Sequence, residues 1–518
     1  MEWRCLLNGI GIKDIMNSNY DVIVIGAGNA GLVAAGIAAK NGLKTLLLEK
    51  NNLPGGSATS FVRGRFEFEV SLQDLDGIGI PEDRRFVYKI LKELGVNIDW
   101  CYEKDLFRVI VTGKDGYDVT VRTGIDGFCE SINEVVPGCE EKVKSLLKLA
   151  LQNKKALNYL FEKDWMPKKL VMKFKYGDFM RTISHSAEEI EKILGIPEKA
   201  RNIINAYWSN YGVPTDELNC EQYLAMLRSY LICKPVVPQR RSFEISEALL
   251  KAYKDNGGEV WFNSMVNKII TNDIGRVIGV EIKGQKLYAR EIISNVIPDN
   301  IFHMMNKNHI PKVALKLANA REIGSSAFMI YLGLDCSREE LGINDYKTFV
   351  MSNPNPRVQY NTNGYYIVNC LNVINPNCSP EGTCILGFYI LCFEEKIPKY
   401  VTMENYKKYK NSIADKFITE YEKIIGKDIK SHIEEISIAT PATFARYLGT
   451  PDGTIYGYKL SDWDNMITRS ISEKDEYNIC GLSFVGGHYI RGHGYAPTYC
   501  TGYSIGKRVV AKLKANKK

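Results

Sequence analysis

The hydrophobic pattern near the start of the chain predicts a strand, a helix and a second strand in close succession. Val22 to Ile25 is a short β-branched apolar run, of the length expected for a buried parallel strand. Leu32 to Ala39 is a run of small and apolar residues that predicts a helix, and Thr45 to Leu48 predicts the second strand. We therefore expect an α/β fold built on a parallel sheet.

Downstream, sections rich in strands alternate with sections rich in helices. One alternating strand is expected from Phe61 to Val70 and a helix from about Pro81 to Gly95, followed by short strands from 105 to 121. Residues 125 to about 230 form a mainly helical section. The second half predicts a helix at 244–256, a strand meander at 266–294, an antiparallel sheet containing 326–332 and 383–392, and an amphipathic helix at 399–425.

The turn between the first strand and helix has the spacing G-x-G-x-x-G, formed by Gly26, Gly28 and Gly31. Such glycines permit a tight turn, a close approach of a pyrophosphate and close packing of helix on strand, while the helix N-terminus offers free N–H groups at Asn29 and Ala30. Glu49, followed by Lys50, ends the second strand. At this position a carboxylate can accept hydrogen bonds from the ribose hydroxyls of a dinucleotide. A glycine-rich turn without a ligand is the alternative; the context favours a dinucleotide site.

Composition excludes several classes of protein. A net charge of +7 over 518 residues is too mild for a dedicated nucleic-acid binder. The thirteen cysteines contain no C-x-x-C pair and the six histidines are scattered, so we expect reduced thiols, a cytoplasmic protein and no metal site. Residues 1–16 are expected to be a dispensable extension, and no run of eighteen apolar residues indicates a transmembrane helix.

The segment from Glu140 to Arg181 combines basic and apolar residues. It contains eleven Lys or Arg against five acids, interleaved with Leu157, Leu160, Phe161, Trp165, Met166, Leu170, Val171, Met172, Phe174 and Phe179. This composition suits a helix at a membrane surface, and equally a solvated basic face on a core helix. Peripheral membrane association therefore stays open.

Four separated stretches resemble the flavin-dependent amine oxidase superfamily. They are 26–49, 54–60, the 257–295 meander and 481–494, and the segment 440–457 is similar to one branch, that of phytoene desaturases, carotenoid cis–trans isomerases and retinol saturases. The resemblance implies FAD as cofactor and an architecture like that of p-hydroxybenzoate hydroxylase and the amine oxidases. It implies a discontinuous Rossmann-type FAD-binding domain (18–104, 231–300 and 438–518), interwoven with a substrate domain of antiparallel sheet and helices (105–230 and 301–437).

The resemblance also implies roles for single residues. Val266 would lie against the adenine, and Gly486 and Gly487 would sit by the pyrophosphate and ribityl chain. The remaining FAD-binding positions are expected in two short segments: Gly55, Gly56 and Ser57; and Gly494, Tyr495, Ala496 and Pro497. A helix beginning near Pro497 would aim its N-terminus at the flavin, where a helix dipole stabilises negative charge.

Candidate catalytic residues lie in the loop His488 to Tyr495. His493 could move a proton, Arg491 could hold a carboxylate or developing charge, and Tyr495 could shape an aromatic wall. His493 as a loop brace and Arg491 as a phosphate or structural ligand are alternatives. Glu67 and Glu69 are expected to be solvated or ion-paired.

The leading functional hypothesis is an FAD-dependent oxidoreductase that desaturates, saturates or isomerises C–C bonds of a small apolar, unsaturated lipid or carotenoid-like substrate. An amine oxidase-like enzyme acting on a C–N bond and a catalytically idle flavoprotein are the alternatives.

Overall fold

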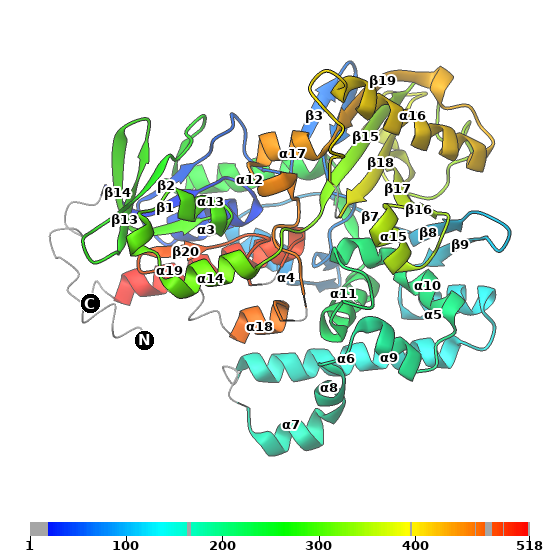
Figure 1. Ribbon diagram of the computed structural model, residues 1–518, viewed down its shortest axis with the longest axis horizontal. Helices are drawn as coiled ribbons and strands as arrows, with labels where there is room; N and C mark the ends of the chain where they lie inside the picture. The colour runs from blue at the N-terminus through cyan, green and yellow to red at the C-terminus, as the bar shows by residue number, and fades with distance from the viewer. Residues whose placement is uncertain are drawn as a thin grey trace.

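A computed structural model describes residues 19–162, 167–393, 396–461, 463–471, 479–490 and 492–515. Figure 1 shows two sheets side by side, with a group of helices below the second one. Each sheet is assembled from segments far apart in the sequence. The expected extension 1–16 lies outside the described residues.

The first sheet is parallel at its centre. Its strand order is β11-β2-β1-β14-β13-β12, with β20 beside β14. The parallel strands are β1 (Tyr20–Ile25), β2 (Thr45–Leu48), β11 (Glu259–Trp261), β14 (Gln285–Ser294) and β20 (Leu482–Phe484). β12 (Lys268–Thr271) and β13 (Val277–Ile282) add an antiparallel meander with β14. The central strands β1 and β2 are mainly apolar, as expected for strands whose two faces are both buried.

The helix after the glycine turn, α3 (Asn29–Lys40), is buried along nearly its whole length. It packs between the first sheet and α19 (Tyr495–Ala515), and α12 (Arg241–Asp255) lies against it as well. Its alanines and glycines allow this, since small side chains let helices approach closely: a Cβ on Gly502 of α19 would stand 2.3 Å from the carbonyl oxygen of Ala30. The C-terminal helix is thereby fixed beside the glycine turn. The same half contains α4 (Phe86–Leu94), α13 (Pro298–His303) and α14 (Lys312–Ala320).

The second sheet has the strand order β19-β15-β18-β17-β16-β8-β9. One face packs on α16 (Tyr406–Ile425), and the other faces a large aromatic core. β15 and β18 are buried at every position because both faces are covered. The strands are β8 (Asp105–Val111), β9 (Tyr117–Arg122), β15 (Ser326–Leu334), β16 (Lys347–Met351), β17 (Tyr365–Cys370), β18 (Cys384–Cys392) and β19 (Ile433–Ala439).

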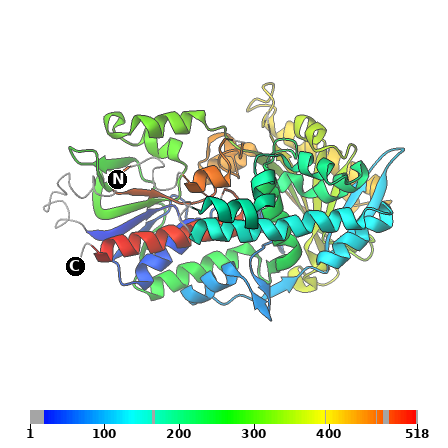
Figure 2. The same cartoon turned by 90° about the horizontal axis from the view of Figure 1, so that it is seen from below.

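A run of helices lies below the second sheet, and Figure 2 shows α6 crossing this lower side of the molecule. They are α5 (Ile125–Val135), α6 (Glu140–Glu162), α7 (Lys169–Lys175), α8 (Gly177–Thr182), α9 (Ala187–Ile193), α10 (Glu198–Ile204) and α11 (Cys220–Cys233). Within the part of the chain that the structure describes, none of the helices is long and apolar enough to cross a membrane.

Short elements complete the fold. Three are the helices α15 (Pro356–Thr362), α17 (Pro441–Leu448) and α18 (Met466–Ile471). The others are two-stranded pairs: β3 (Ser60–Arg63) with β4 (Phe66–Glu69), β5 (Gly79–Ile80) with β6 (Asp83–Arg84), and β7 (Trp100–Tyr102) with β10 (Val236–Pro238).

Several expected elements differ in the structure. The single strand expected from 61 to 70 is the β3–β4 hairpin, because Gly64 adopts a positive φ and turns the chain. The second sheet is mixed and not purely antiparallel, because β8 pairs parallel with β16. The helix expected from Pro81 begins at Phe86, since the residues before it form β6.

The segments also group somewhat differently from the expected domains. Residues 301–320 were expected in the substrate domain, yet Ile301, Phe302 and Ala314 pack in the core of the first sheet. Phe66 and Phe68, expected in the FAD domain, pack in the core of the second sheet. β19 crosses the expected boundary at 438. Packing, and not chain order, decides which half each segment joins.

Candidate active site

The glycine turn after β1 is held by very close backbone contacts. A Cβ on Gly31 would stand 2.0 Å from the carbonyl oxygen of Gly26, so only glycine lets α3 meet the strand this closely. Gly26 has φ +94°, a conformation that side chains disfavour. The side-chain oxygen of Asn29 is buried there and has no hydrogen-bond partner among the residues that the structure describes. The N-terminus of α3 thus presents backbone N–H groups and an unused polar group at one spot.

A second pair of glycines lies against the first turn. Gly55 and Gly56 have positive φ, and Gly55 N donates to Ala27 O at 2.8 Å. A Cβ on Gly56 would approach the Cα of Gly28 to 3.5 Å. The two glycine segments therefore form one surface of bare backbone. Side-chain-free backbone of this kind is what a cofactor needs to approach closely.

Asn295, just after β14, occupies the centre of these glycines and was not singled out by the sequence. Its side-chain nitrogen would be 2.7 Å from a Cβ on Gly28, and its oxygen 2.5 Å from one on Gly486. It follows the carboxyl end of a strand parallel to β1, where ligands bind in α/β sheets. That strand position is the signal that could have identified it. We call Gly26, Gly28, Gly31, Gly55, Gly56, Gly486 and Asn295 the glycine cluster.

Glu49 is buried at the carboxyl end of β2. Its carboxylate accepts hydrogen bonds from Ala27 N and Asn51 N, each at 2.8 Å. Burial raises the pKa of Glu49, and these two hydrogen bonds partly oppose that shift. Val266 is buried. It lies near Glu49, because Ser264, two residues earlier in the chain, donates its backbone N–H to Glu49 O. Lys50, in contrast, points away and donates to the carbonyl of Arg446 in α17.

The loop from Gly486 to Pro497 brings the C-terminal part of the chain to the glycine cluster. Gly486 N donates a hydrogen bond to Thr501 Oγ1 at 3.3 Å, and Gly487 is half-buried next to it. Gly494 has φ +101° and precedes α19, which begins at Tyr495 and not at Pro497. Proline is tolerated in the first helical turn, because its missing N–H would have no partner there. Ala496 is buried against the first core.

Tyr495 joins three segments. Its hydroxyl donates to Ser57 O at 3.1 Å and lies 3.0 Å from Ser71 Oγ, which also donates to Ser57 O. The start of α19, the loop after Gly56 and the strand end after β4 are thereby tied together. Tyr495 therefore positions backbone around the site through its hydroxyl.

His493 is held by a stack and a hydrogen bond. Its ring lies 4.0 Å from the ring of Tyr456, nearly parallel to it, and Nε2 donates to Asn210 O at 3.0 Å. Within the described part of the chain, Nδ1 is buried without a hydrogen-bond partner. Burial lowers the pKa of His493 to about 4, so the ring is neutral at pH 7 with an unprotonated Nδ1. The residue can accept a hydrogen bond there and is a weak base.

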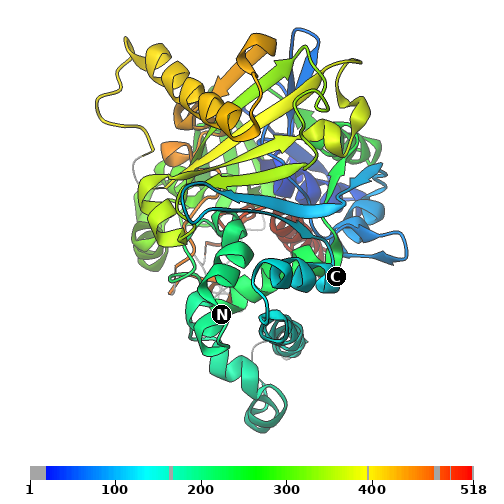
Figure 3. The ribbon, with the colours of Figure 1, turned by 90° about the vertical axis from the view of Figure 1, so that its right-hand side faces the viewer.

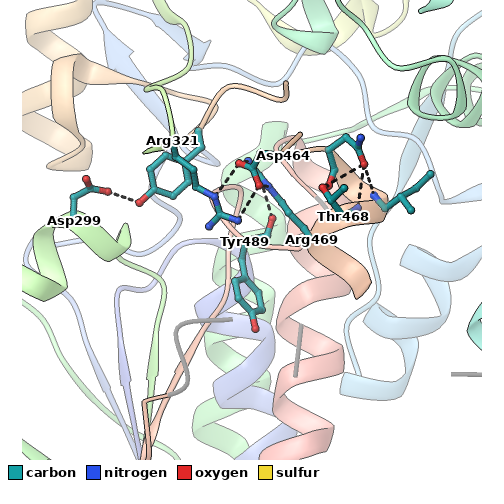
Figure 4. A network of polar contacts seen from close by, with 9 residues as sticks. Asp299, Arg321, Asp464, Thr468, Arg469 and Tyr489 are labelled. Carbon is teal, nitrogen blue, oxygen red and sulfur yellow. Dashed lines mark hydrogen bonds and ion pairs between the residues drawn. The ribbon is translucent and has the colours of Figure 1, made fainter. Parts of the chain in front are cut away.

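His488, earlier in the same loop, is buried beside an ion-pair network drawn in Figure 4. Asp464 accepts hydrogen bonds from both Arg321 and Arg469, at 2.6 to 2.9 Å. Arg469 also donates to Tyr489 O at 3.2 Å and so anchors the loop. Burial, and then the charges of the two arginines, lower the pKa of His488 to about 3. Arg491 lies outside the described residues.

A small cavity lies between the second sheet and the segment 68–72. We call it the chamber. Its wall is largely aromatic and apolar: Phe68, Leu72, Val237, Pro238, Tyr331, Tyr346, Leu371, Ile385 and Tyr389, with the polar residues Glu69, Arg241 and Asn369. The hydrogen bond between Ser71 and Tyr495 places this wall next to the loop that leads into α19.

Two of the three polar residues of the chamber wall, Glu69 and Arg241, are occupied by protein contacts, while the side-chain nitrogen and oxygen of Asn369 are buried without a hydrogen-bond partner among the described residues. Glu69 accepts hydrogen bonds from Ser242 N and Oγ, each at 2.7 Å, and from the backbone N–H groups of Ser71 and Leu72. The expectation of a solvated or ion-paired Glu69 is therefore wrong: it caps the start of α12. Arg241 donates to Glu67 O at 2.8 Å. The chamber consequently offers mainly apolar surface.

These observations fit FAD. The glycine cluster and the α3 N-terminus would hold the pyrophosphate, Glu49 and Val266 the adenosine part, and the start of α19 the flavin end. When bound, FAD supplies hydride-transfer chemistry. The chain supplies bare backbone, helix N-termini and a chamber next to the flavin end.

Comparison with known proteins agrees with this fit. A family model described as FAD dependent oxidoreductase matches residues 21–98. Prolycopene isomerase of Daucus carota is 24% identical over 96% of this chain and 81% of its own length. All-trans-retinol 13,14-reductase of Danio rerio is 23% identical over 85% of this chain and 77% of its own length.

Solved structures share the fold. Cyclohexylamine oxidase from Brevibacterium oxydans superposes with a TM-score of 0.61 at 13% identity, over 96% of this chain and 99% of its own. The fold is thus that of the flavin amine oxidases, while the relatives by sequence are isomerases and reductases. The chain is an FAD-dependent oxidoreductase homologous to the prolycopene isomerases and the all-trans-retinol 13,14-reductases.

Proposed function

We propose that this protein uses FAD to desaturate, saturate or isomerise C–C bonds of an apolar, unsaturated lipid or carotenoid-like substrate. The observation that carries the proposal is the chamber: its wall is mainly aromatic and aliphatic, and it adjoins the loop at Tyr495. The names of the relatives by sequence, prolycopene isomerase and retinol reductase, support the same substrate class.

The chamber suits such a substrate for physical reasons. Tyr331, Tyr346 and Tyr389 offer flat aromatic surface to a conjugated chain, and Leu371 and Ile385 exclude water. Two of the hydroxyls are directed to backbone: Tyr331 donates to Val70 O at 2.7 Å, and Tyr346 donates to Gln73 O. Their rings, and not their polar ends, are left for the ligand.

We further propose that Tyr495 positions the backbone around the site. We also propose that His493 accepts a hydrogen bond at its unprotonated Nδ1. Tyr495 holds Ser57 and Ser71 together, which fixes the chamber against the start of α19. His493 Nδ1 is positioned to accept a hydrogen bond, because its Nε2–H is already donated to Asn210 O. Arg491 stays a prediction from the sequence.

Anaerobic flavin spectroscopy tests the proposal. The FAD-loaded protein is mixed with all-trans polyenes, poly-cis polyenes, unsaturated fatty acids or amines, before and after chemical reduction. We expect bleaching or reoxidation of the flavin, or isomerisation by the reduced protein, with at least one polyene or fatty acid. Reaction with amines alone, with release of hydrogen peroxide, would instead establish the amine oxidase hypothesis.

A further inference from the structure

The helix α7 forms an exposed tip of the molecule. In Figures 1 and 3 it lies at the lower end, on the far side of α6 from the sheets. Its closest packing partner is the neighbouring helix α8, which in turn packs on α6. The tip therefore projects from the fold without being needed for either sheet.

Large apolar side chains are exposed on this tip. Leu170 is 70% exposed, Phe174 is 78% exposed and Met180 of α8 is 52% exposed. Leu170 and Phe174 are four residues apart on α7 and so project from one face of the helix. A single exposed leucine is ordinary; a leucine and a phenylalanine on one face of a projecting helix form a patch that water solvates poorly.

The opposite side of α7 explains why this patch faces outward. Met172 is buried and packs with Ala156, Leu160 and Phe179 in a small core beneath the tip, which also includes Ile467 of α18. These buried residues hold the tip in place. Leu160, Met172 and Phe179 are therefore core residues and do not contribute to a membrane-facing surface, while Trp165 and Met166 lie outside the described residues.

Exposed lysines flank Leu170 and Phe174 in the sequence. Lys168, Lys169, Lys173 and Lys175 are all exposed, and none of the four forms an ion pair with another described residue. The one acid between 167 and 181 is Asp178, and it pairs with Arg181. The patch thus combines unpaired positive charge with apolar side chains at its centre.

We propose that the α7 tip docks the protein on a lipid bilayer surface that contains anionic phospholipid. Leu170 and Phe174 would enter the boundary between headgroups and acyl chains, while the lysines contact the phosphates. The proposal is independent of the reaction on C–C bonds.

The charges favour a bilayer over a second copy of the chain. A symmetric contact between two tips would bring the four unpaired lysines of each copy together, which costs free energy through repulsion. A bilayer with anionic lipid offers acyl chains to the apolar patch and phosphates to the lysines at the same time. This combination is typical of amphipathic surface helices.

Co-sedimentation with vesicles tests the proposal. The full-length, FAD-loaded protein is spun with vesicles of phosphatidylcholine and phosphatidylglycerol in a three-to-one ratio, and with pure phosphatidylcholine. We expect binding to the mixed vesicles that weakens in high salt. The double variant L170S/F174S should lower the partition coefficient about ten-fold or more, because its apolar contacts are lost. K169E/K173E should lower it similarly at low salt.

A matched control comes from the opposite end of the molecule. Tyr400 and Met403 are 69% and 93% exposed and precede α16 in the sequence, and Figure 1 shows α16 on the far side of the molecule from α7. The variant Y400S/M403S removes as much exposed apolar surface, and its partition should change by less than about two-fold. Flavin absorbance and thermal melting verify that every variant is folded.

Three outcomes would overturn the proposal. In the first, the wild-type protein stays in solution with the mixed vesicles. In the second, L170S/F174S binds them as well as Y400S/M403S does. In the third, light scattering without vesicles shows a wild-type dimer that L170S/F174S converts to a monomer, which would make the tip an interface between copies. Because no turnover is measured, failure here leaves the proposed reaction to its own test.

Discussion

The two halves of the molecule build their parts of the site in different ways. The glycine cluster is made mainly of backbone, and a single added methyl group at Gly31 would collide with a carbonyl oxygen. The chamber is made of side chains from strands that are well separated in the sequence, such as β4, β15 and β18. The glycine cluster therefore leaves little room for added atoms, and the chamber wall determines the shape offered to a substrate.

This difference explains what each half can change. A surface made of backbone, with several glycines at positive φ, has one fixed shape and suits a single cofactor. A wall of aromatic and aliphatic side chains can be reshaped one residue at a time without disturbing the sheet behind it. Homologues with different reactions on one fold are the expected result. Four predictions test the comparison, from the largest expected effect to the smallest.

The first prediction concerns two glycines of the same helix. In Gly31→Ala the new Cβ meets the Gly26 carbonyl at 2.0 Å, so backbone must move, and we expect loss of bound FAD and a cost of about 3 kcal/mol in unfolding free energy. Gly36→Ala meets the end of the Leu94 side chain at 3.1 Å, which can move, so FAD stays bound. Flavin absorbance after gel filtration and denaturant unfolding measure both. Equal behaviour of the two variants would contradict a backbone-built site.

The second prediction concerns Asn295. Asn295→Leu removes the polar side chain at the centre of the glycine cluster, so we expect FAD affinity to fall about ten- to a hundred-fold, as for loss of a hydrogen bond to a charged group. Asn300→Ala, which loses a hydrogen bond to Gly449 O in the same half of the molecule, serves as control. Fluorescence titration of the apoprotein with FAD gives both affinities. Unchanged affinity in Asn295→Leu would remove this residue from the cofactor site.

The third prediction compares the two faces of β18. Tyr389 faces the chamber, while its neighbour Phe388 packs beneath α16. Tyr389→Ala should lower kcat/KM about ten-fold for an accepted polyene and leave FAD affinity unchanged. Phe388→Leu should lower the melting temperature and leave kcat/KM within about two-fold. A reversed pattern would place the substrate elsewhere.

The fourth prediction concerns acid sensitivity. Burial lowers the pKa of His493 to about 4, below the value of about 6.5 expected in the unfolded chain. Between these values the unfolded chain binds the extra proton, so stability is present above about pH 6.5 and is lost as the pH falls toward 4. His493→Gln should show a smaller drop in melting temperature from pH 7.5 to pH 5 than the wild type.

Local pattern was a good guide where neighbouring residues decide the structure. The strands before and after the glycine turn, and the helix between them, were predicted from fewer than thirty residues, because buried strands and small-residue helices have local signatures. The hairpin at Gly64 and the parallel pairing of β8 with β16 were missed. The hairpin depends on the backbone conformation of Gly64, and the pairing of β8 with β16 depends on which distant segment lies alongside; alternation of residues encodes neither.

The histidines illustrate the same limit within the site. His493 was a candidate proton carrier because its usual pKa lies near neutrality. The fold places it under Tyr456 and against Asn210, and burial moves its pKa to about 4. A residue's chemistry therefore follows from its surroundings, and those come from segments hundreds of residues away.

The sequence by itself determined the cofactor class, because glycine spacing and a carboxylate after the second strand act locally on one turn and one strand end. The tertiary structure decided three further things. Asn295 stands among the glycines, and the chamber wall is mainly apolar. Within the basic segment 140–181, Leu170 and Phe174 of α7 face outward. The physical reason is that a side chain's burial, and with it its charge state and partners, is a property of packing between distant segments.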